Sequence, residues 1–477
     1  MKKLLVCMTP LWSLLLQGVA EKPIVVIIPS YNNATYVEKN LNSVYNQEYE
    51  NYRVIYIDDC SKDKTLVMVR EIVAQRGQSH RTTIIHNDHN CGAMANFYHA
   101  IHSLFSAQDV VGEALNSVDN MITSGHVCND NDIIVQLDGD DWLKHNRVLA
   151  RVNQEYSDHD VWMTYGRCEY YPEGKPDGQK LLPHSIIAKG AYREYEKVPS
   201  HLRTFYAGLF KAIALQDFLY QGSFLKMNCD LAIMFPLLEM ANGKVGFIND
   251  IIHVYNCATP INDYKKNILL QLHLDHVLRS RDKYKPVTTF ETSSLKFEPA
   301  VFIVSSDKEK AAACKKSLES SMSSIGRIKV ISSDSAAKDL LRELDAVSSD
   351  FVFVVDEAFS CVVPFDITLF TQALAQTKAQ VFCLDRGVDT AEDCDFVFVK
   401  VNELVYGWQF ILSEHEWRKP FGARAHIYAK KTLKEALSRL KLQDGKNIFE
   451  ALNGLIVDVN SVGLCSQESF FRSIYEN

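Results

Sequence analysis

Three aspartates near position 140 have a spacing that suits the binding of a divalent cation. Asp138 and Asp140 are separated by Gly139 and directly follow the apolar residues 133–137, and Asp141 comes next. Hard cations such as Mg²⁺ or Mn²⁺ take oxygen ligands, often one or two protein carboxylates together with substrate phosphates. The pattern therefore predicts a metal–diphosphate site, with the glycine leaving room for a ligand. The alternative is a solvated acidic turn, because so short a motif recurs by chance.

The elements that must position these aspartates alternate between apolar strands and amphipathic helices. Four short apolar segments predict strands, at 24–28, 54–57, 83–85 and 133–137. Strand–helix alternation predicts parallel strands joined by right-handed crossovers, and such sheets bind ligands at the carboxyl ends of their strands. Polar loops follow all four strands, at 29–33, 58–59, 90–92 and 138–140. We therefore expect these loops to meet at one edge of one sheet.

Length and composition indicate a globular protein of two or three domains. The chain has 477 residues, of which 47% are apolar and 23% charged. Its net charge of −8 gives no electrostatic basis for binding nucleic acid, and no basic block suggests a membrane patch. The 12 cysteines include no C-x-x-C pair, which argues against zinc. Cys60 and Cys383 lie in or beside predicted strands, where cysteine acts as a small buried hydrophobe.

The first twenty residues have the pattern of a secretory signal peptide. Lys2 and Lys3 precede the apolar run 4–16, and the small residues 18–20 offer a cleavage site. The alternative is a retained membrane anchor, although the run is short of the about 20 residues that span a bilayer. The sequence leaves the location open between the secretory pathway, the periplasm and a membrane-anchored state. Any membrane association would be through the N-terminus only.

The second half of the chain begins a new series of strands and helices. Residues 286–298 have the composition of a linker, and apolar strands are predicted at 301–304, 328–331 and 351–355. We expect a second, smaller α/β domain over residues 299–477. It is either a degenerate copy of the first domain or an unrelated α/β domain, and its role stays open.

Five motifs between residues 22 and 260 resemble those of the family-two inverting glycosyltransferases. They lie at 26–33, 43–47, 57–63, 90–96 and 137–142. The family usually has glycine where Cys60 stands. The resemblance implies the GT-A fold of nucleotide-diphospho-sugar transferases, with a Rossmann-like mixed sheet, over residues 22–285. It does not cover the second domain.

The resemblance also implies a nucleotide-sugar site. Pro29 and Tyr31 would line the base and ribose pocket, and Asp59 would accept a hydrogen bond from the pyrimidine ring of a uridine-type donor. Asn90 and Gly92 would shape the pocket near the donor phosphates. The alternative for Asp59 is a turn-forming residue that caps the next helix.

Further roles carried over from the family concern the metal and the base. Asp138 would contact the ribose or the metal and Asp140 would hold the metal, whereas Asp141 would cap the segment after it. Asp230 is the expected general base. The family often has a Glu-Asp pair there, but Cys229 takes the first position. The alternative for Asp230 is a carboxylate stabilised by the positive end of a helix dipole.

Five other residues could contribute to the site. Four of them have both a functional and a structural interpretation, and the fifth has a structural one only. Glu239 would orient the acceptor or lie on the surface. His201 and Arg203 would reach acceptor or phosphate, or be solvated. His253 would be a further metal ligand or a half-buried histidine, and Asp58 is interpreted as structural.

The predicted function is non-processive, metal-dependent, inverting sugar transfer of the hexosyl or N-acetylhexosaminyl type. A UDP-sugar is the favoured donor, Mn²⁺ or Mg²⁺ the cofactor, and a hydroxyl of a glycan, lipid or protein the acceptor. One alternative is a sugar nucleotidyltransferase, although the loop 29–35 lacks the glycines and basic residues that grip triphosphate. The other is a catalytically weak carbohydrate-binding pseudoenzyme. Asn33 begins a formal glycosylation motif, but it lies beside the predicted nucleotide loop.

Overall fold

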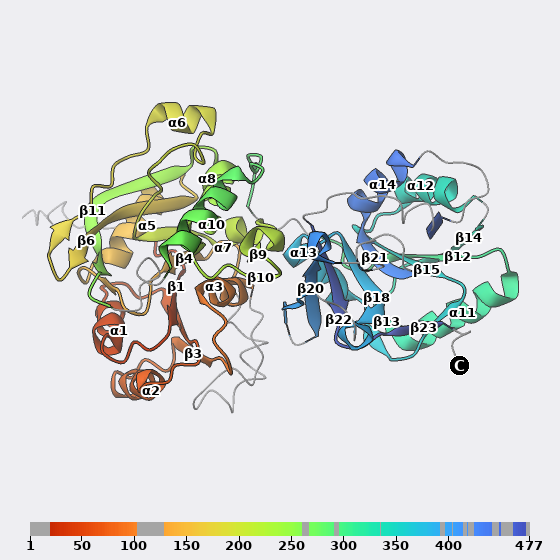
Figure 1. The fold of residues 1–477 in the computed structure, drawn as a ribbon, viewed down its shortest axis with the longest axis horizontal. Coiled ribbons are helices and arrows are strands. Elements are labelled where there is room, and N and C mark those ends of the chain that lie inside the picture. Colours follow the sequence, from red (N-terminus) through yellow and green to blue (C-terminus); the bar gives the residue numbers. More distant parts are fainter. Residues whose placement is uncertain are drawn as a thin grey trace, which may run out of the picture.

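The structure is a computed structural model with two lobes, each built on its own sheet (Figure 1). It describes residues 20–102, 128–259, 267–290, 295–333, 335–391, 396–402, 404–413, 417, 424–440, 448–449 and 461–473. The predicted signal peptide lies outside the described residues apart from Ala20. Within the described part of the chain, no helix is both long enough and apolar enough to cross a membrane.

The first lobe contains a nine-stranded sheet. In spatial order its strands are β3 (Thr82–His86), β2 (Tyr52–Asp58), β1 (Ile24–Ser30), β4 (Ile133–Gln136), β8 (Arg203–Tyr206), β6 (Met163–Tyr171), β11 (Val245–Asn256) and β5 (Trp142–Leu143), with β7 (Lys175–Pro176) paired to β6. β1 pairs in parallel with β2 and β4, and β2 with β3. The parallel strands predicted from the first 140 residues are therefore confirmed.

The helices of this lobe are α1 (Val37–Tyr45), α2 (Thr65–Gln75), α3 (Ala93–His102), α5 (Val148–Asp158), α6 (His184–Lys189), α7 (Ala207–Lys211), α8 (Cys229–Ala241) and α10 (Ile268–Ser280), with the 3₁₀ helix η3 (Leu215–Phe218). Every residue of β1 is buried, as the continuous apolar run of a central parallel strand requires. The strand ends at Ser30, and the polar loop that follows it contains Tyr31 and Asn33.

Helix α8 carries the predicted base at its start and has Pro236 in its interior. A proline there removes one backbone hydrogen bond and normally ends or kinks a helix. All side chains from Leu231 to Ala241 are nevertheless buried. Burial of apolar surface on all sides therefore holds the helix together through the proline.

The second lobe contains an eight-stranded sheet. In spatial order its strands are β14 (Ile328–Ile331), β12 (Ala300–Val304), β15 (Phe351–Asp356), β21 (Ala425–Ala429), β18 (Val381–Gly387), β22 (Val462–Ser466), β20 (Val405–Gln409) and β19 (Val399–Lys400). Its helices are α11 (Lys308–Ser321), α12 (Ala336–Ala346), α13 (Thr368–Thr377) and α14 (Lys430–Arg439), with the 3₁₀ helices η4 (Val388–Thr390) and η5 (Phe410–Leu412). Small two-stranded sheets join β9 (Leu219–Tyr220) to β10 (Ser223–Phe224), β13 (Met322–Ser323) to β17 (Phe365–Asp366), and β16 (Phe359–Cys361) to β23 (Phe471–Ser473).

The two sheets repeat one pattern of pairing. From β2 through β1, β4, β8, β6 and β11 to β5, the pairs are parallel, parallel, antiparallel, antiparallel, parallel and antiparallel. The second sheet has the same six parallel and antiparallel pairings in the same order. They run from β14 through β12, β15, β21, β18 and β22 to β20. Differences also exist among the described residues, including β7 beside β6 and β19 beyond β20, which have no counterparts in the other sheet. Nothing corresponds to β3 beyond β14, and β20 follows β18 in the chain whereas β5 precedes β6.

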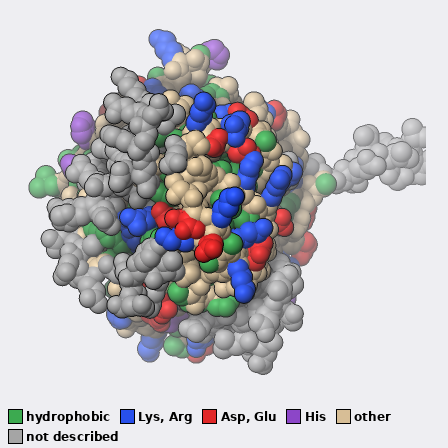
Figure 2. Space-filling model, turned by 90° about the vertical axis from the view of Figure 1, so that its right-hand side faces the viewer, with side chains coloured by type: hydrophobic (Ala, Val, Ile, Leu, Met, Phe, Trp, Pro, Cys, Tyr) green, Lys and Arg blue, Asp and Glu red, His purple; other side chains and the backbone are tan. Residues whose placement is uncertain are grey.

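The side of the molecule at the second lobe carries charged side chains of both signs. Figure 2 shows Lys and Arg interspersed with Asp and Glu, without a broad hydrophobic patch outside the grey residues. Within α11 and α12, ion pairs join Lys315 to Glu319 and Arg342 to Asp339. Such mixed charge is typical of a solvated helical surface.

Candidate active site

The acidic turn after β4 is held against the end of β1 and the start of α1. The Gly139 N–H donates to the Pro29 carbonyl at 3.1 Å, and the Asp141 N–H donates to the Asp138 carbonyl at 3.0 Å. The buried side chain of Asn40 donates to the carbonyl oxygens of Asp138 and Asp141, at 3.0 and 2.8 Å. One amide from α1 therefore holds both ends of the turn that presents the aspartates.

Gly139 has a different reason for being glycine than the sequence suggested. A Cβ at this position would lie 2.5 Å from Ser30 Oγ and 2.8 Å from Asn33 Nδ2. No side chain fits in that space, because Cβ atoms do not approach other atoms so closely. The glycine therefore lets the acidic turn pack on the loop after β1. That it also leaves room for a ligand stays a prediction.

Asp59 organises the loop after β3. Its buried carboxylate accepts hydrogen bonds from the Cys91 N–H and the Gly92 N–H, both at 2.8 Å, and from the Asn87 amide at 2.7 Å. Asn90 donates from its side chain to the Asp59 carbonyl at 3.2 Å. Gly92 has a φ of +87°, a conformation that favours glycine. Asp59, Asn90 and Gly92 thus meet as predicted, while a contact to a pyrimidine ring stays a prediction.

The remaining predicted nucleotide residues end β1. Pro29 is buried within the strand, and Tyr31 follows it half-buried. Asp58 is buried and contacts His86 Nδ1 at 2.8 Å, in line with its structural interpretation. Cys60 has a φ of +62°, a conformation that favours glycine, the residue that the resemblance to the family led us to expect here.

Asp141 lies at the centre of a buried cluster instead of capping the segment after it. Its carboxylate accepts the Asn256 N–H at 2.7 Å and contacts His253 Nε2 at 2.9 Å. The rings of His253 and His201 stack with centroids 4.7 Å apart. One potential ligand atom from each of Asp141, His201 and His253 falls within 4.8 Å of the others. This group is the candidate metal cluster that the structure adds to Asp138 and Asp140.

Electrostatics at this cluster favour a cation. Burial, with the charge of Asp141 nearby, raises the pKa of Asp138 to about 6, and burial raises the pKa of Asp141 to about 7. Burial also lowers the pKa of His253 to about 3 and lowers that of His201, so both imidazoles stay neutral. The buried Nδ1 of His253 has no hydrogen-bond partner. The buried carboxyl groups of Asp138 and Asp141 would be stabilised in their ionised forms by a cation. The neutral imidazole of His253 has a free ring nitrogen that can coordinate one, so these side chains suit a metal ion.

Arg203 joins the expected base to this cluster. Its guanidinium contacts Asp230 Oδ2 at 3.2 Å and His201 Nε2 at 3.3 Å. Asp230 stands in the first turn of α8, and its side chain is 39% exposed. The negative charge of Asp230 is also near enough to contribute to the raised pKa of Asp138. The aspartate turn and Asp230 therefore belong to one site, and Arg203 is a buried part of it.

Glu239 matches neither of its two interpretations. It is buried and makes a two-point ion pair with Arg193, at 2.6 and 2.9 Å, and it accepts the Tyr284 N–H at 2.9 Å. It therefore ties α8 to neighbouring loops and neither orients an acceptor nor lies on the surface.

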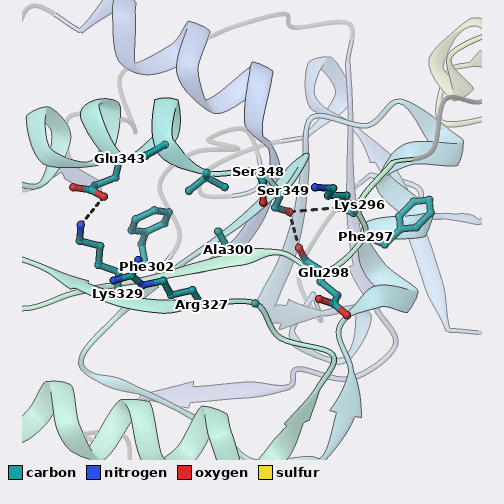
Figure 3. Close-up of a pocket in the computed structure, with 13 residues that line it drawn as sticks. Lys296, Phe297, Glu298, Ala300, Phe302, Arg327, Lys329, Glu343, Ser348 and Ser349 are labelled. Carbon is teal, nitrogen blue, oxygen red and sulfur yellow. Dashed lines mark hydrogen bonds and ion pairs between the residues drawn. The ribbon is translucent and has the colours of Figure 1, made fainter.

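A cavity of about 490 Å³ lies away from these residues, in the second lobe (Figure 3). It opens at the amino ends of β12 and β14, whereas the candidate site lies at carboxyl ends. Lys329 pairs with Glu343 on one side of it, and on the other the Ser349 hydroxyl donates to the Glu298 carbonyl at 2.6 Å. No member of the carboxylate cluster lines this cavity.

Residues 25–104 match the model of glycosyl transferase family 2. The match covers the part of the chain that contains β1, β2 and β3 and the loops that follow them. The resemblance drawn from the motifs is thereby confirmed, and with the mixed sheet of the first lobe so is the predicted GT-A fold class.

Two curated relatives are similar to the same part of the chain. A putative teichuronic acid biosynthesis glycosyltransferase, TuaG of Bacillus subtilis, is 38% identical over 74 residues, which is 15% of this chain and 28% of that protein. An uncharacterized glycosyltransferase of Haemophilus influenzae is 37% identical over 68 residues, 14% of this chain and 21% of that protein. The chain thus matches less than a third of the length of these relatives.

Solved structures give a partial likeness. The mannosyltransferase PcManGT of Pyrobaculum calidifontis, in complex with GDP-Man and Mn²⁺, has a TM-score of 0.35 at 17% identity, covering 56% of this chain and 66% of that one. TarS 1–349 of S. aureus, in complex with UDP-GlcNAc, has a TM-score of 0.34 at 16% identity, covering 54% and 66%.

Proposed function

We propose that the first lobe is a metal-dependent, inverting glycosyltransferase that moves a sugar from a nucleoside diphosphate to an acceptor hydroxyl. A UDP-sugar is the favoured donor. The observation that carries the proposal is the bridge formed by Arg203, which links Asp230 on α8 to the cluster around Asp141. The match of residues 25–104 to glycosyl transferase family 2 supports the reaction class.

The proposed ion is Mn²⁺ or Mg²⁺. Asp138, Asp140 and Asp141 would hold it together with His253, whose second ring nitrogen is unused. A mixture of carboxylate oxygens and imidazole nitrogen favours Mn²⁺, because Mg²⁺ prefers all-oxygen ligands. When bound, the ion supplies positive charge that stabilises the departing diphosphate.

Asp230 is the proposed general base. Its carboxylate is open to solvent, and Arg203 orients it from the side of the metal cluster. From that position it can accept the proton of an acceptor hydroxyl as the oxygen attacks the sugar. A single displacement of this kind inverts the configuration at the sugar carbon. Asp59, with the loop it organises, would bind the nucleotide at the carboxyl ends of β2 and β3.

Donor turnover by the full chain tests this proposal. UDP release from UDP-GlcNAc, UDP-glucose or UDP-galactose in the presence of Mn²⁺ is expected, and Asp140→Ala should abolish it. Asp158→Ala is the matched control, because Asp158 is exposed and lies on α5 away from the site. Absence of UDP release from every donor, or equal rates in the two variants, would contradict the proposal. A donor that binds but is never turned over would favour the pseudoenzyme instead.

A further inference from the structure

Two neighbouring tyrosines at the end of β6 stand out by their exposure. Tyr170 and Tyr171 are 38% and 37% exposed, more than any other Phe, Tyr or Trp side chain that the structure describes. Both lie beside the last residues of β11, where Tyr255 pairs with Tyr170 and Asn256 with Tyr171. Aromatic rings left in water at one place often mark a surface that binds a ligand.

The two tyrosines point in different directions. Successive side chains of a strand face opposite sides of the sheet. The ring of Tyr170 meets the ring of Tyr255 edge-on, with centroids 6.1 Å apart. The ring of Tyr171 instead meets Trp142 at 5.1 Å, and Lys39 Nζ lies 4.6 Å from its centre. Tyr171 thus belongs to a packed group with its own cation, and Tyr170 does not.

Tyr255 connects Tyr170 to the metal cluster. Its ring lies 5.1 Å from that of His201, which stacks on His253. Burial raises the pKa of Tyr255, and the nearby charges of Asp141, Asp138 and Asp140 raise it further. A row of rings therefore leads from the metal ligands to the surface, and Tyr170 is its exposed end. The residues that organise the nucleotide loop lie on the other side of the cluster, at the ends of β2 and β3.

We infer that Tyr170 forms one wall of an acceptor subsite that takes a pyranose of a glycan. The inference rests on the proposed function and names the class of acceptor for the same site. A pyranose has an apolar face of C–H groups, which gains by leaving water against an aromatic ring, while its hydroxyls stay free for polar contacts. A lipid chain would need a continuous apolar groove, whereas an exposed aromatic ring beside a polar cluster suits the mixed apolar and polar surface of a sugar. Tyr255 would form the inner side of the subsite, next to the metal cluster.

Calorimetry on the full chain tests the subsite with defined sugars. The protein is saturated with UDP and Mn²⁺ and titrated with cellobiose, lactose, chitobiose and maltose. We expect at least one disaccharide to bind, and Tyr170→Ala to weaken its affinity by about three- to tenfold, the effect of losing one aromatic contact. Tyr170→Phe should retain the affinity, because it keeps the ring. Tyr171→Ala is the matched control, equal in residue type and exposure, and should change the affinity less than about twofold.

The outcomes separate the two proposals. If no disaccharide binds to a chain that does bind UDP with Mn²⁺, or if both alanine variants weaken binding equally, the subsite is overturned and sugar transfer stands. If UDP with Mn²⁺ does not bind at all, the proposed function fails and the subsite falls with it. A selective loss in Tyr170→Ala, restored by phenylalanine, supports the subsite.

Discussion

The two sheets share a pattern of parallel and antiparallel strand pairs, but their buried carboxyl groups have pKa values shifted in opposite directions. In the first lobe, burial and neighbouring charge raise the pKa of Asp138 and Asp141, and the adjacent His253 stays neutral. In the second lobe, Asp385 lies 3.2 Å from His426, and His426 and Arg386 lower its pKa despite its burial. The second lobe balances its buried carboxylate with its own side chains. The first leaves a deficit of positive charge that an ion can fill.

The loops that follow β1 in the first lobe and β12 in the second also differ in their hydrogen bonds. In the first lobe, Ser30 Oγ accepts hydrogen bonds from the Tyr56 hydroxyl and the Asn33 side-chain amide. In the second lobe, the carboxylate of Glu357 after β15 accepts from the Ser305 hydroxyl. We propose that the second lobe is a degenerate copy that kept the sheet and lost the donor chemistry. A shared fold alone therefore does not make a site, and the chemistry depends on which side chains stand at the strand ends.

The largest expected effect separates the two lobes by catalysis. Asp230→Asn should lower sugar transfer by about 10² to 10⁴, the usual contribution of a general base. Glu357→Gln in the second lobe should leave the rate within about twofold, because a degenerate copy performs no chemistry. Steady-state rates of UDP release measure both. Similar losses in the two variants would mean that both lobes are catalytic.

Metal binding should also be confined to the first lobe. Asp141→Asn is expected to weaken Mn²⁺ about 10- to 100-fold, because the buried carboxylate orients His253 or binds the ion itself. Asp385→Asn should leave Mn²⁺ affinity unchanged and lower the free energy of unfolding by about 1–3 kcal/mol, as it removes a charge partner of buried His426. Equilibrium dialysis and denaturant unfolding are the measurements. More than one Mn²⁺ per chain would refute the comparison.

The raised carboxyl pKa values predict a pH-dependent response to metal. Asp138 and Asp141 titrate at about 6 and about 7, above the usual 3.8. Their protonated forms favour the fold, so this stability is complete below the unfolded pKa and is lost as pH rises through about 7. A bound cation favours the ionised forms instead. The gain in Tm from Mn²⁺ should therefore be small near pH 5.5 and grow toward pH 8. A gain that does not vary with pH in this range contradicts the assignment.

The smallest effect concerns the packing of the acidic turn. Gly139→Ala should lower the free energy of unfolding by about 1–3 kcal/mol, because its Cβ meets Ser30. It should weaken Mn²⁺ as well, since the turn must shift. Gly178→Ala is the control, with no atom within 4 Å of its Cβ. Equal stability of the two variants in denaturant unfolding would show that the turn does not depend on this contact.

The strands of the first lobe and two of its acidic site residues could be predicted from the sequence. The contacts between residues far apart in the chain could not. Continuous apolar runs located β1 and β4, because strands buried on both faces have no polar alternation. The acidic spacing singled out Asp138 and Asp140. The pairing of Asp141 with His253 could not be foreseen, because it joins residues 112 positions apart through the register of β5 on β11. The ion pair of Glu239 with Arg193 likewise depends on how α8 packs, which no local pattern encodes.

Asn40 gives the acidic turn its shape before any ion arrives. Because a buried side chain from a helix clasps two carbonyl groups of that turn, cation capture requires no folding of the loop. The entropy of ordering is already spent when the polypeptide folds. Because the site is preorganised, Mn²⁺ should bind rapidly and with almost no change in heat capacity. Without the hydrogen bonds from Asn40, the aspartate turn would have to become ordered each time an ion binds, which would weaken binding.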